Sequence, residues 1–350
     1  MTSGSVFKRL KTSEPLIGTH NGQFHADEAL AVYLLRLLPA YSSSSLIRTR
    51  DPARLKQCHT VVDVGGDYSP PDNRYDHHQR TFDTTFPSRP TKLSSAGLVY
   101  MHFGKPIIAL QTGLDEESEQ VDILWRKLYT DFVEALDAHD NGISVYDPKD
   151  TQGLQKRFYD GGISLGSLIG DLNAWPDEEE RGELSAAQVQ EAEDNRFLEA
   201  STLIGSVFQR KLKYYHRNWL PARTEVRANY AVRVRHDREG RIMVFERGVP
   251  WQDHLYMLEA EDLKQQQVLY VLYPEGQHEG SKWRIQAVPI TKDSFESRKP
   301  LPEAWRGLRD EALDKVMGFE GGVFVHASGF IGGNKSRHGA INMAKKALEL

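Results

Sequence analysis

The chain has 350 residues, of which 39% are hydrophobic and 27% charged, and its formal net charge is −5. At roughly 100–200 residues per domain, this composition and length predict an ordinary globular protein of about two domains. No apolar run approaches the roughly 18 residues of a membrane span, and the single cysteine, Cys58, excludes an intrachain disulfide framework and leaves secretion unsupported.

The N-terminal segment, residues 1–15, is predicted to be flexible. It carries Lys8, Arg9 and Lys11 and no acidic residue before Glu14. This composition suits a short mitochondrial presequence, although a frayed N-terminus explains it at least as well.

Residues 16–180 are predicted to form the first domain, because β-branched runs alternate there with helical patterns. We expect strands at 16–20, 46–49 and 60–64 and helices at 26–38, 95–103 and 121–139. This alternation predicts βαβ units and a mainly parallel sheet. Ligands of such sheets bind beyond the carboxyl ends of the strands, and His20 and Asp63 lie at two such ends.

A smaller second domain is predicted for residues 221–350, after a helical connector at 181–220. An acidic loop at 177–183 precedes the connector, whose helix at 186–219 is expected to end before Pro221. The second domain has a strand-rich pattern and a final helix, with elements at 231–234, 242–245, 268–273, 283–288, 323–326 and 336–350. The predicted fold class is therefore α/β for both domains.

Histidines and aspartates are crowded together in the first 140 residues of the chain, which has 13 histidines in all. Four clusters lie at predicted strand or helix ends: His20 to Glu28; Asp63 with Gly65-Gly66; Asp76-His77-His78; and Asp137 to Gly142. The two glycines let the backbone turn away from the sheet after Asp63.

This mixture of side chains suits a pair of divalent ions. Two ions about 3.5–4 Å apart need a bridging carboxylate and several terminal ligands, and such a pair generates hydroxide and clamps a phosphoryl oxygen. Carboxylates combined with imidazoles favour Mn²⁺, Fe²⁺, Co²⁺ or Zn²⁺ over Mg²⁺, which prefers oxygen ligands alone. The pattern predicts phosphoester hydrolysis.

Each cluster by itself also has a structural interpretation. A single histidine such as His20 is more often a hydrogen-bonding residue than a ligand, and Asp63 could cap a helix. The Asp-Asn-Gly sequence ending at Gly142 is usually a turn, and the adjacent His77 and His78 could be accidental. The coincidence of all four clusters in one α/β half favours a metal site.

The order of these clusters resembles that of the DHH phosphoesterase superfamily, which includes RecJ-type exonucleases and family II inorganic pyrophosphatases. Four longer strings match more closely still: THNGQFHADEALA, VVDVGGDYSPPDNRYDHHQRTF, DAHDNGI and VFVHASGFIGGNKSRHGA. The resemblance extends from Ile17 to about Ala347. Together they are similar to the melanocyte-proliferating-gene-1 family of DHH-like 3′–5′ RNA exonucleases.

The resemblance implies roles for individual residues. The metal ligands would be His20, His25, Asp27, Asp63, His77 and a carboxylate of the last motif, for which Asp140 fits best and Asp137 is the rival. His78 would contact the phosphate, and Asp76 would orient an imidazole, so both belong to the catalytic set. One departure is His25, which stands where the superfamily pattern has an aspartate. The added imidazole should favour ions such as Mn²⁺.

A glycine-rich segment before the last helix is the predicted substrate grip of the second domain. Taken alone, the segment from Gly329 to Arg337 favours a simple glycine turn, and Asn334 between Gly333 and Lys335 excludes a Walker A loop. The resemblance instead implies a phosphate-binding loop. Its substrate-binding residues would be Gly332, Gly333, Asn334, Lys335, Ser336 and Arg337, with Arg284, His326 and Ser328 nearby.

The expected function is that of a two-metal 3′–5′ exonuclease acting on single-stranded RNA in a cleft between two domains. Its two divalent ions are expected to be Mn²⁺, with Mg²⁺ or Co²⁺ as alternatives. Two other functions stay open: hydrolysis of small phosphate compounds, and RNA binding without turnover. The resemblance implies location in the mitochondrion and nucleus, with the cytoplasm as an alternative, and the oligomeric state is not determined by the sequence.

Overall fold

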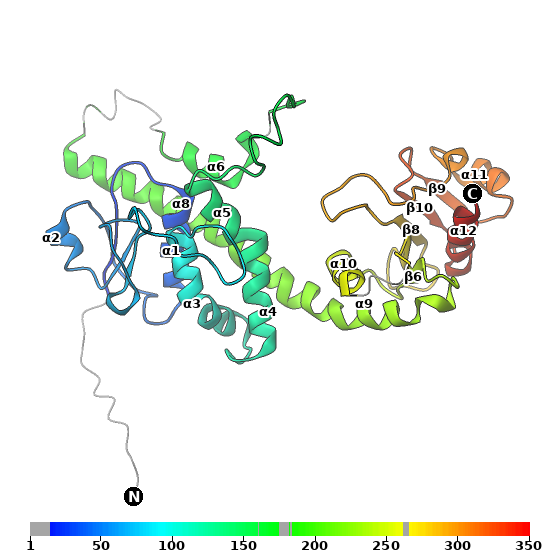
Figure 1. Ribbon diagram of the computed structural model, residues 1–350, viewed down its shortest axis with the longest axis horizontal. Coiled ribbons are helices and arrows are strands. Elements are labelled where there is room, and N and C mark those ends of the chain that lie inside the picture. Colours follow the sequence, from blue (N-terminus) through cyan, green and yellow to red (C-terminus); the bar gives the residue numbers. More distant parts are fainter. Residues whose placement is uncertain (1–14, 160, 175–181, 183, 262–265) are drawn as a thin grey trace, which may run out of the picture. The chain divides into compact units, whose positions relative to one another are not determined.

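The computed structural model describes residues 15–159, 161–174, 182, 184–261 and 266–350 (Figure 1). The chain divides into two units, Met1–Tyr214 and Tyr215–Leu350, which are described separately. The predicted N-terminal segment and most of the acidic loop at 177–183 lie outside the described residues.

The first unit is built on a sheet with the strand order β2-β1-β3-β5-β4. Strands β2, β1, β3 and β5 pair in parallel and β4 is antiparallel to β5; their bounds are Ile17–Thr19 (β1), Leu46–Arg48 (β2), Thr60–Val62 (β3), Tyr68–Ser69 (β4) and Arg74–Tyr75 (β5). The predicted mainly parallel sheet is therefore confirmed.

The hairpin of β4 and β5 occupies a region in which the sequence analysis expects no strand. A 3₁₀ turn at Pro70–Asp72 joins the two strands, and Asn73 follows it in the left-handed conformation with φ 55°. Each strand contributes only two residues, which is too short for an alternating hydrophobic pattern to show.

Helix α1 is the central helix of the first unit, because it packs against both α3 and α8 (Figure 1). Its Leu30, Leu34 and Leu35 are fully buried. The helices of this unit are Ala26–Arg36 (α1), Pro52–Leu55 (α2), Ser95–Thr112 (α3), Glu119–Leu128 (α4), Glu134–Asp140 (α5), Leu165–Asp171 (α6) and Ala186–Tyr214 (α8), with a 3₁₀ turn at Gly161–Ile163. Helix α3 is longer than predicted, because it continues past Pro106 to the left-handed Gly113.

A π-helical segment at Tyr129–Val133 divides the predicted helix 121–139 into α4 and α5. The ring of Tyr129 stacks on that of Phe86, with ring centroids 3.6 Å apart. π-Bulges are rare and are frequently found near functional sites. Here the segment immediately precedes α5, which carries Asp137 and Asp140.

Helical structure continues past Pro221, so the predicted end of the connector helix is wrong. A π-helical segment at Tyr215–Trp219 follows α8, and α9 then runs from Leu220 to Val232. Pro221 lies in the first turn of α9, where a missing N–H is tolerated. The predicted strand 231–234 is also wrong: α9 and a 3₁₀ turn, Arg233–Arg235, occupy it, and Val234 is 53% exposed rather than buried on a sheet.

The second unit contains a mixed sheet with the order β6-β7-β8-β10-β9. Only β6 and β7 are parallel; the other neighbours are antiparallel, and the bounds are Ile242–Val244 (β6), Tyr270–Pro274 (β7), Trp283–Ala287 (β8), Gly322–Val325 (β9) and Ile331–Asn334 (β10). The predicted second α/β domain is therefore present.

Alternating side chains give this sheet a separate core on each face. Leu272 of β7 belongs to the core beside α11 (Asp310–Met317) and α12 (Arg337–Glu349), whereas Val271 belongs to the core that includes residues of α9 and α10 (Gln252–Glu261). A further 3₁₀ turn lies at Glu303–Trp305. No helix of the described residues is long and apolar enough to cross a bilayer.

Candidate metal centre

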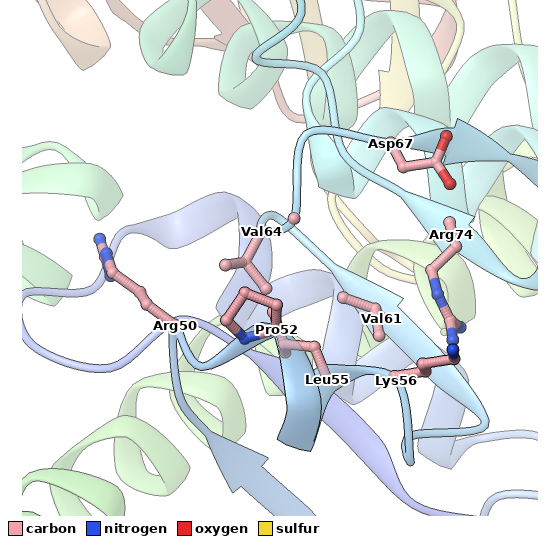
Figure 2. Close-up of a pocket in the computed structure, with 9 residues that line it drawn as sticks. Arg50, Pro52, Leu55, Lys56, Val61, Val64, Asp67 and Arg74 are labelled. Atoms are coloured by element: carbon pink, nitrogen blue, oxygen red, sulfur yellow. The ribbon is translucent and has the colours of Figure 1, made fainter.

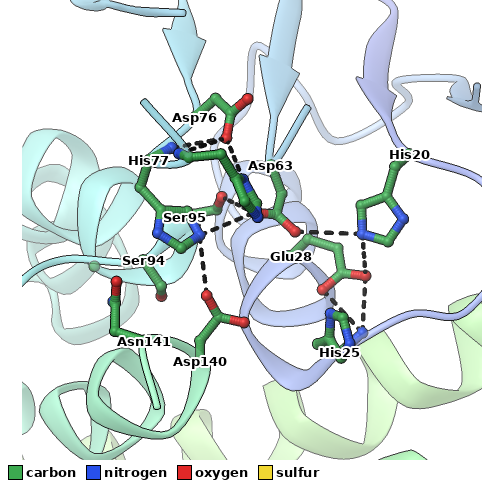
Figure 3. A network of polar contacts seen from close by, with 12 residues as sticks. His20, His25, Glu28, Asp63, Asp76, His77, Ser94, Ser95, Asp140 and Asn141 are labelled. Atoms are coloured by element: carbon green, nitrogen blue, oxygen red, sulfur yellow. Dashed lines mark hydrogen bonds and ion pairs between the residues drawn. The ribbon is translucent and has the colours of Figure 1, made fainter. Parts of the chain in front are cut away.

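Loops at the carboxyl ends of β1, β3 and β5 bring the predicted metal ligands together (Figure 3). His20 follows β1, Asp63 follows β3, and Asp76 and His77 follow β5. Because the three strands are parallel neighbours, their ends meet at one edge of the sheet. The predicted position of His20 and Asp63 at strand ends is confirmed.

Asp63 lies at the centre of the cluster. Its Oδ2 is 3.3 Å from Nε2 of His20, and its Oδ1 is 3.2 Å from Nε2 of His77. The Oγ of Ser95, in the first turn of α3, donates a 2.9 Å hydrogen bond to the same Oδ1. The two oxygens of Asp63 therefore face different histidines, which is the arrangement expected of a bridging carboxylate.

The backbone of Asp63 adopts a left-handed conformation with φ 58°, which is uncommon for a residue other than glycine. Gly65 and Gly66 follow with φ values of 101° and 70°. The predicted sharp turn after the strand is confirmed. Backbone strain of this kind is found at functional sites, where the surrounding structure holds the residue in place.

Helix α1 supplies the second group of side chains through its first turn. The carboxylate of Glu28 accepts hydrogen bonds from the backbone N–H of His25 at 2.9 and 3.1 Å, and its Oε1 is also 3.1 Å from Nε2 of His20. Glu28 is fully buried, whereas His25 is exposed. Our sequence prediction did not include Glu28 as a site residue. Its position three residues after the N-cap, typical of a capping box, is the signal that could have found it.

Asp27 is the residue whose surroundings indicate a bound cation most clearly. It is 1% exposed, and neither of its carboxylate oxygens has a hydrogen-bond partner among the described residues. Burial, together with the charges of Asp63, Glu28 and Asp140, raises the pKa of Asp27 well above its usual range. A buried carboxylate without donors fits a metal ligand, because a cation would supply the missing partner.

The histidines next to the carboxylates hold protons tightly in this arrangement. Burial lowers the pKa of both His20 and His77, but contacts with Asp63 and Glu28 for His20, and with Asp140 and Asp63 for His77, raise each pKa to about 9. Burial likewise opposes ionisation of Asp63, but its histidine partners lower its pKa below the usual range. The cluster thus balances buried negative charge with protonated imidazoles, a role that a divalent cation can also fill.

Asp76 orients the two histidines that follow it. Its Oδ1 accepts a 2.7 Å hydrogen bond from the backbone N–H of His77 and lies 2.7 Å from Nδ1 of His78. The side chain of His77 is only 5% exposed and that of His78 is 62% exposed. The structure therefore places His77 inside the cluster and His78 at its surface.

Asp140 and Asp137 lie in one helix but in different surroundings. Oδ2 of Asp140 is 2.9 Å from Nε2 of His77, so this carboxylate belongs to the cluster. Asp137 is fully buried, and its Oδ1 accepts hydrogen bonds from Ser94 and Gly97 while its Oδ2 accepts one from Tyr129. Its oxygens are thus occupied by donors of the protein, and it lies apart from the candidate ligands.

Three groups of side chains in the described residues could each hold a cation, with ligand atoms within 4.8 Å of one another: His20, His25, Glu28 and Asp63; Asp63, His77 and His78; and His25, Asp27 and Asp140. The first two groups share Asp63, and the first and third share His25. The donors are imidazole nitrogens and carboxylate oxygens without a thiolate, so the residues fit divalent ions such as Mn²⁺.

Part of the predicted phosphate loop, Ile331–Asn334, is strand β10, so the prediction of a loop is wrong for these residues, whereas Lys335 and Ser336 form the bend before α12. Gly332 and Gly333 lie in β10, which pairs with β8 on one side and β9 on the other. A Cβ atom at Gly333 would lie 2.5 Å from Nη1 of Arg284 and 3.2 Å from the carbonyl oxygen of Trp283. The glycines therefore allow close packing within the sheet.

The remaining predicted residues of the second unit lie around the end of β10. Buried Asn334 accepts a hydrogen bond from the backbone N–H of Ser336, which caps α12. Both Lys335 and Arg337 are exposed. Nη2 of Arg337 lies 2.9 Å from Oε1 of Glu246.

Other predicted residues of this unit lie on neighbouring elements. Nδ1 of His326 is 2.9 Å from Oγ of Ser328, and both residues are exposed. The guanidinium of Arg284 contacts Glu275 and lies over the ring of Phe324. These residues are thus present in one unit, and their substrate-binding role stays a prediction.

Comparisons with known proteins identify the family of the chain. Residues 16–348 match the MYG1 exonuclease family model, described as an uncharacterised protein family (UPF0160). The chain is 46% identical to the MYG1 exonuclease of Mus musculus over 95% of this chain and 85% of that protein. It is 45% identical to the MYG1 exonuclease of Homo sapiens (95% and 86% covered) and 42% identical to the MYG1 protein of Dictyostelium discoideum (96% and 97% covered).

Solved structures add little to this assignment. The exonuclease RecJ bound to manganese is 12% identical, with 95% of this chain and 89% of that chain covered, and its TM-score is 0.26. The family match rests instead on identity along nearly the whole chain, which therefore belongs to the MYG1 family.

Proposed function

We propose that this protein is a metal-dependent exonuclease that hydrolyses the phosphodiester bonds of single-stranded RNA from the 3′ end. The observation that carries the proposal is the position of Asp63, whose two oxygens face His20 and His77 and join two groups of candidate ligands. The exonuclease names of the relatives that share most of the chain support the same reaction class.

Two divalent ions are proposed to occupy the cluster, with Asp63 as the shared ligand. His20, His25 and Glu28 would hold one side. His77 and Asp140, whose side chains lie 2.9 Å apart, would hold the other, and Asp27 would join through its group with His25 and Asp140. Such a pair lowers the pKa of water and stabilises negative charge on the phosphoryl oxygens of an in-line displacement. The imidazole-rich donor set favours Mn²⁺, with Mg²⁺ and Co²⁺ as alternatives.

His78 is proposed to contact the phosphate that is cleaved. Its side chain is exposed, and Asp76 fixes its orientation through a 2.7 Å contact with Nδ1. This contact with Asp76 is the main reason that the pKa of His78 is raised, and burial opposes it. A cationic imidazole held at the surface of the cluster would attract a phosphodiester anion.

The second unit is proposed to bind the nucleic acid strand through exposed polar side chains. Lys335 and Arg337 flank the start of α12, and the pair His326 and Ser328 lies in the turn before β10. Lysine and arginine side chains neutralise phosphates without reading the base sequence. Binding of this kind suits an enzyme that shortens many different strands.

A substrate panel tests the proposed activity. Purified protein would be given a labelled RNA ladder, the matched DNA, pyrophosphate and dinucleotides, each with Mn²⁺, Mg²⁺, Co²⁺ or a chelator. Stepwise shortening of the RNA from its 3′ end, lost with the chelator, is the expected result. Label at either end of the strand distinguishes 3′–5′ from 5′–3′ shortening.

Two other results would replace the proposal. Cleavage of pyrophosphate or dinucleotides alone would identify an enzyme for small phosphate compounds, which the net charge of −5 and the absence of a long basic run in the sequence would suit. Binding of RNA without turnover under every metal condition would identify a binding protein.

Location in the mitochondrion and the nucleus is proposed from the family resemblance alone. The cationic residues Lys8, Arg9 and Lys11 are the part of the sequence that would direct import. A fluorescent fusion with and without residues 1–14 tests this: loss of the mitochondrial signal on deletion is expected, and an unchanged distribution would remove the role of the segment.

A further inference from the structure

A pocket of about 270 Å³ lies on the first unit beside α2, which contributes Pro52 and Leu55 to its lining (Figure 2). Its floor is apolar and includes buried Leu55 and Val61 together with half-buried Val64. Small-molecule pockets usually run from about 300 to 1,000 Å³, with mostly apolar walls and a few polar groups. The volume of this cavity lies just below that range, so the cavity suits a small group.

Three cations and one acid complete the lining of the pocket. Arg50 and Lys56 are exposed, and no ion pair joins either of them to a carboxylate among the described residues. The guanidinium of Arg74 is fixed by carbonyl oxygens, including a 3.1 Å hydrogen bond to Cys58. Asp67 is the only acid among the lining residues. The rim of the pocket is therefore cationic and attracts anions.

Two short connections link the lining of the pocket to residues of the metal cluster. Val64 and Gly65, which line the pocket, directly follow Asp63 in the chain. Nη1 of Arg50 donates a 2.8 Å hydrogen bond to the carbonyl oxygen of Asn21, the residue after His20. The loop after Asp63 thus lines part of the pocket, and the loop after His20 contacts Arg50 of its lining.

The backbone at Gly65 is open to a ligand. Its φ is 101°, and a Cβ atom built there would meet nothing within 4 Å. A side chain at this position would be strained and would project into the open space. Because Gly65 has no side chain and is exposed, its backbone is accessible to a molecule bound in the pocket.

We propose that this pocket holds one nucleotide of the substrate strand, next to the phosphodiester that the metal cluster cleaves; this inference rests on the proposed function. The base would lie against the apolar floor of Leu55, Val61 and Val64. The adjoining phosphate would contact Lys56 at the cationic rim. A strand passing along this edge of the sheet would then meet the pocket and the cluster in succession.

The substitution Lys56→Gln tests the pocket, and Arg54→Gln is its matched control. Arg54 lies in α2, whose C-cap is Lys56, and it is also exposed, but it does not line the pocket. Both changes remove one positive charge from the same region. A general electrostatic effect would therefore be similar in the two variants, whereas a contact in the pocket would be lost only in Lys56→Gln.

The first measurement is the KM for hydrolysis of a labelled RNA strand of 12 nucleotides. Loss of a charged phosphate contact should raise KM by about tenfold in Lys56→Gln, with a much smaller change in Arg54→Gln. The ratio of kcat/KM for the strand to that for bis(p-nitrophenyl) phosphate, which has no nucleotide, should fall by a similar factor. Equal KM values for Lys56→Gln and the parent would overturn the proposal.

A binding measurement keeps this inference separate from the proposed activity. Fluorescence anisotropy of the same strand in chelator gives Kd without turnover, and its salt dependence should become shallower by about 0.7 in Lys56→Gln. If the parent cleaves no RNA, the proposed function fails, but a selective loss of binding in Lys56→Gln still supports the pocket. Equal losses in both variants would overturn it.

Discussion

The metal cluster of the first unit lies in loops that follow strands, whereas the glycine-rich segment of the second unit lies inside a sheet. The loops leave carboxylates and imidazoles free to face one another, as Asp63 faces His20 and His77. In β10, by contrast, Gly332 and Gly333 pair with strands on both sides. The sequence predicts a role in phosphate chemistry for both segments. The cluster loops leave polar side chains free for a ligand, whereas the backbone of β10 is already paired with its neighbouring strands.

Glycine is required for different reasons in the two segments. Gly65 has a positive φ and open space around it, so it allows a turn and an approach to the backbone. A Cβ atom at Gly332 would lie 3.0 Å from Cδ1 of Leu301 and 3.1 Å from the carbonyl oxygen of Phe324. That glycine is required by packing, and any role in binding falls to its neighbours.

Asp63→Asn should cause the largest loss of activity. Asparagine tolerates the left-handed backbone conformation of this position, so the fold should be retained. Groups that only orient a metal ligand typically contribute about 10–100-fold, so loss of the shared carboxylate should reduce kcat by at least about a hundredfold. Steady-state kinetics with Mn²⁺ and a melting curve measure the two effects. Full activity with normal metal binding would exclude Asp63 as the shared ligand.

The pair Asp140→Ala and Asp137→Ala should separate catalysis from stability. Asp140→Ala should greatly reduce activity with little change in melting temperature, because Asp140 faces His77. Asp137→Ala should reduce the free energy of unfolding by about 1–3 kcal/mol or more, because buried donors lose their acceptor. Chemical denaturation and kinetics on both variants measure the contrast, and the reverse pattern would make Asp137 the ligand.

The metal-free protein should lose stability as pH rises through about 9. The pKa of His20 and of His77 is raised from 6.5 to about 9, because carboxylate contacts outweigh burial, so the folded state binds these protons more tightly. This stabilisation is fully present below pH 6.5 and is lost as pH rises through 9. Melting temperatures in chelator at several pH values test it.

Added Mn²⁺ should reverse this pH dependence. Ligation requires neutral imidazoles, so metal affinity should increase with pH and binding should release protons near neutral pH. Calorimetry in buffers of different ionisation enthalpy counts those protons. A melting temperature of the metal-free protein that is constant between pH 6.5 and 9 would contradict the ion pairs of His20 and His77.

Gly332→Ala should destabilise the second unit without a specific effect on catalysis. The added methyl group would press on Leu301 and on the backbone of Phe324, and overpacking of this kind typically costs about 1–3 kcal/mol. Denaturation with urea measures the loss. If stability is unchanged and substrate binding alone falls, the segment is a ligand-binding element after all, and the contrast with Gly65 disappears.

Arg337→Ala should give the smallest effect, a rise in KM for RNA of a few-fold with little change in kcat. Arg337 is exposed and lies 2.9 Å from the carboxylate of Glu246, so part of its charge is already compensated. Glu246→Gln is the matched control, because it frees the guanidinium and should lower KM. An unchanged KM in both variants would remove Arg337 from the substrate-binding residues.

Much of the first unit could be predicted because its signals are local. The β-branched run at Thr60–Val62 predicts a strand, and Asp63 with the two following glycines predicts a turn at its end. Parallel strands place their carboxyl ends at one edge, so His20 and Asp63 could be expected to meet. Residue types and their spacing along the chain determine these features.

The tertiary structure decided which side chains of each segment face the cluster. The sequence favours Asp140 as the ligand and leaves Asp137 as the rival. Only the packing of α5 against the start of α3 shows that Asp137 accepts hydrogen bonds from Ser94 and Gly97 instead. Glu28 enters the site through the turn that His25 caps. Likewise, Gly332 and Gly333 lie in a strand only because β8 and β9 pair with β10 on its two sides. Contacts between segments distant in the chain depend on packing that local sequence patterns do not encode.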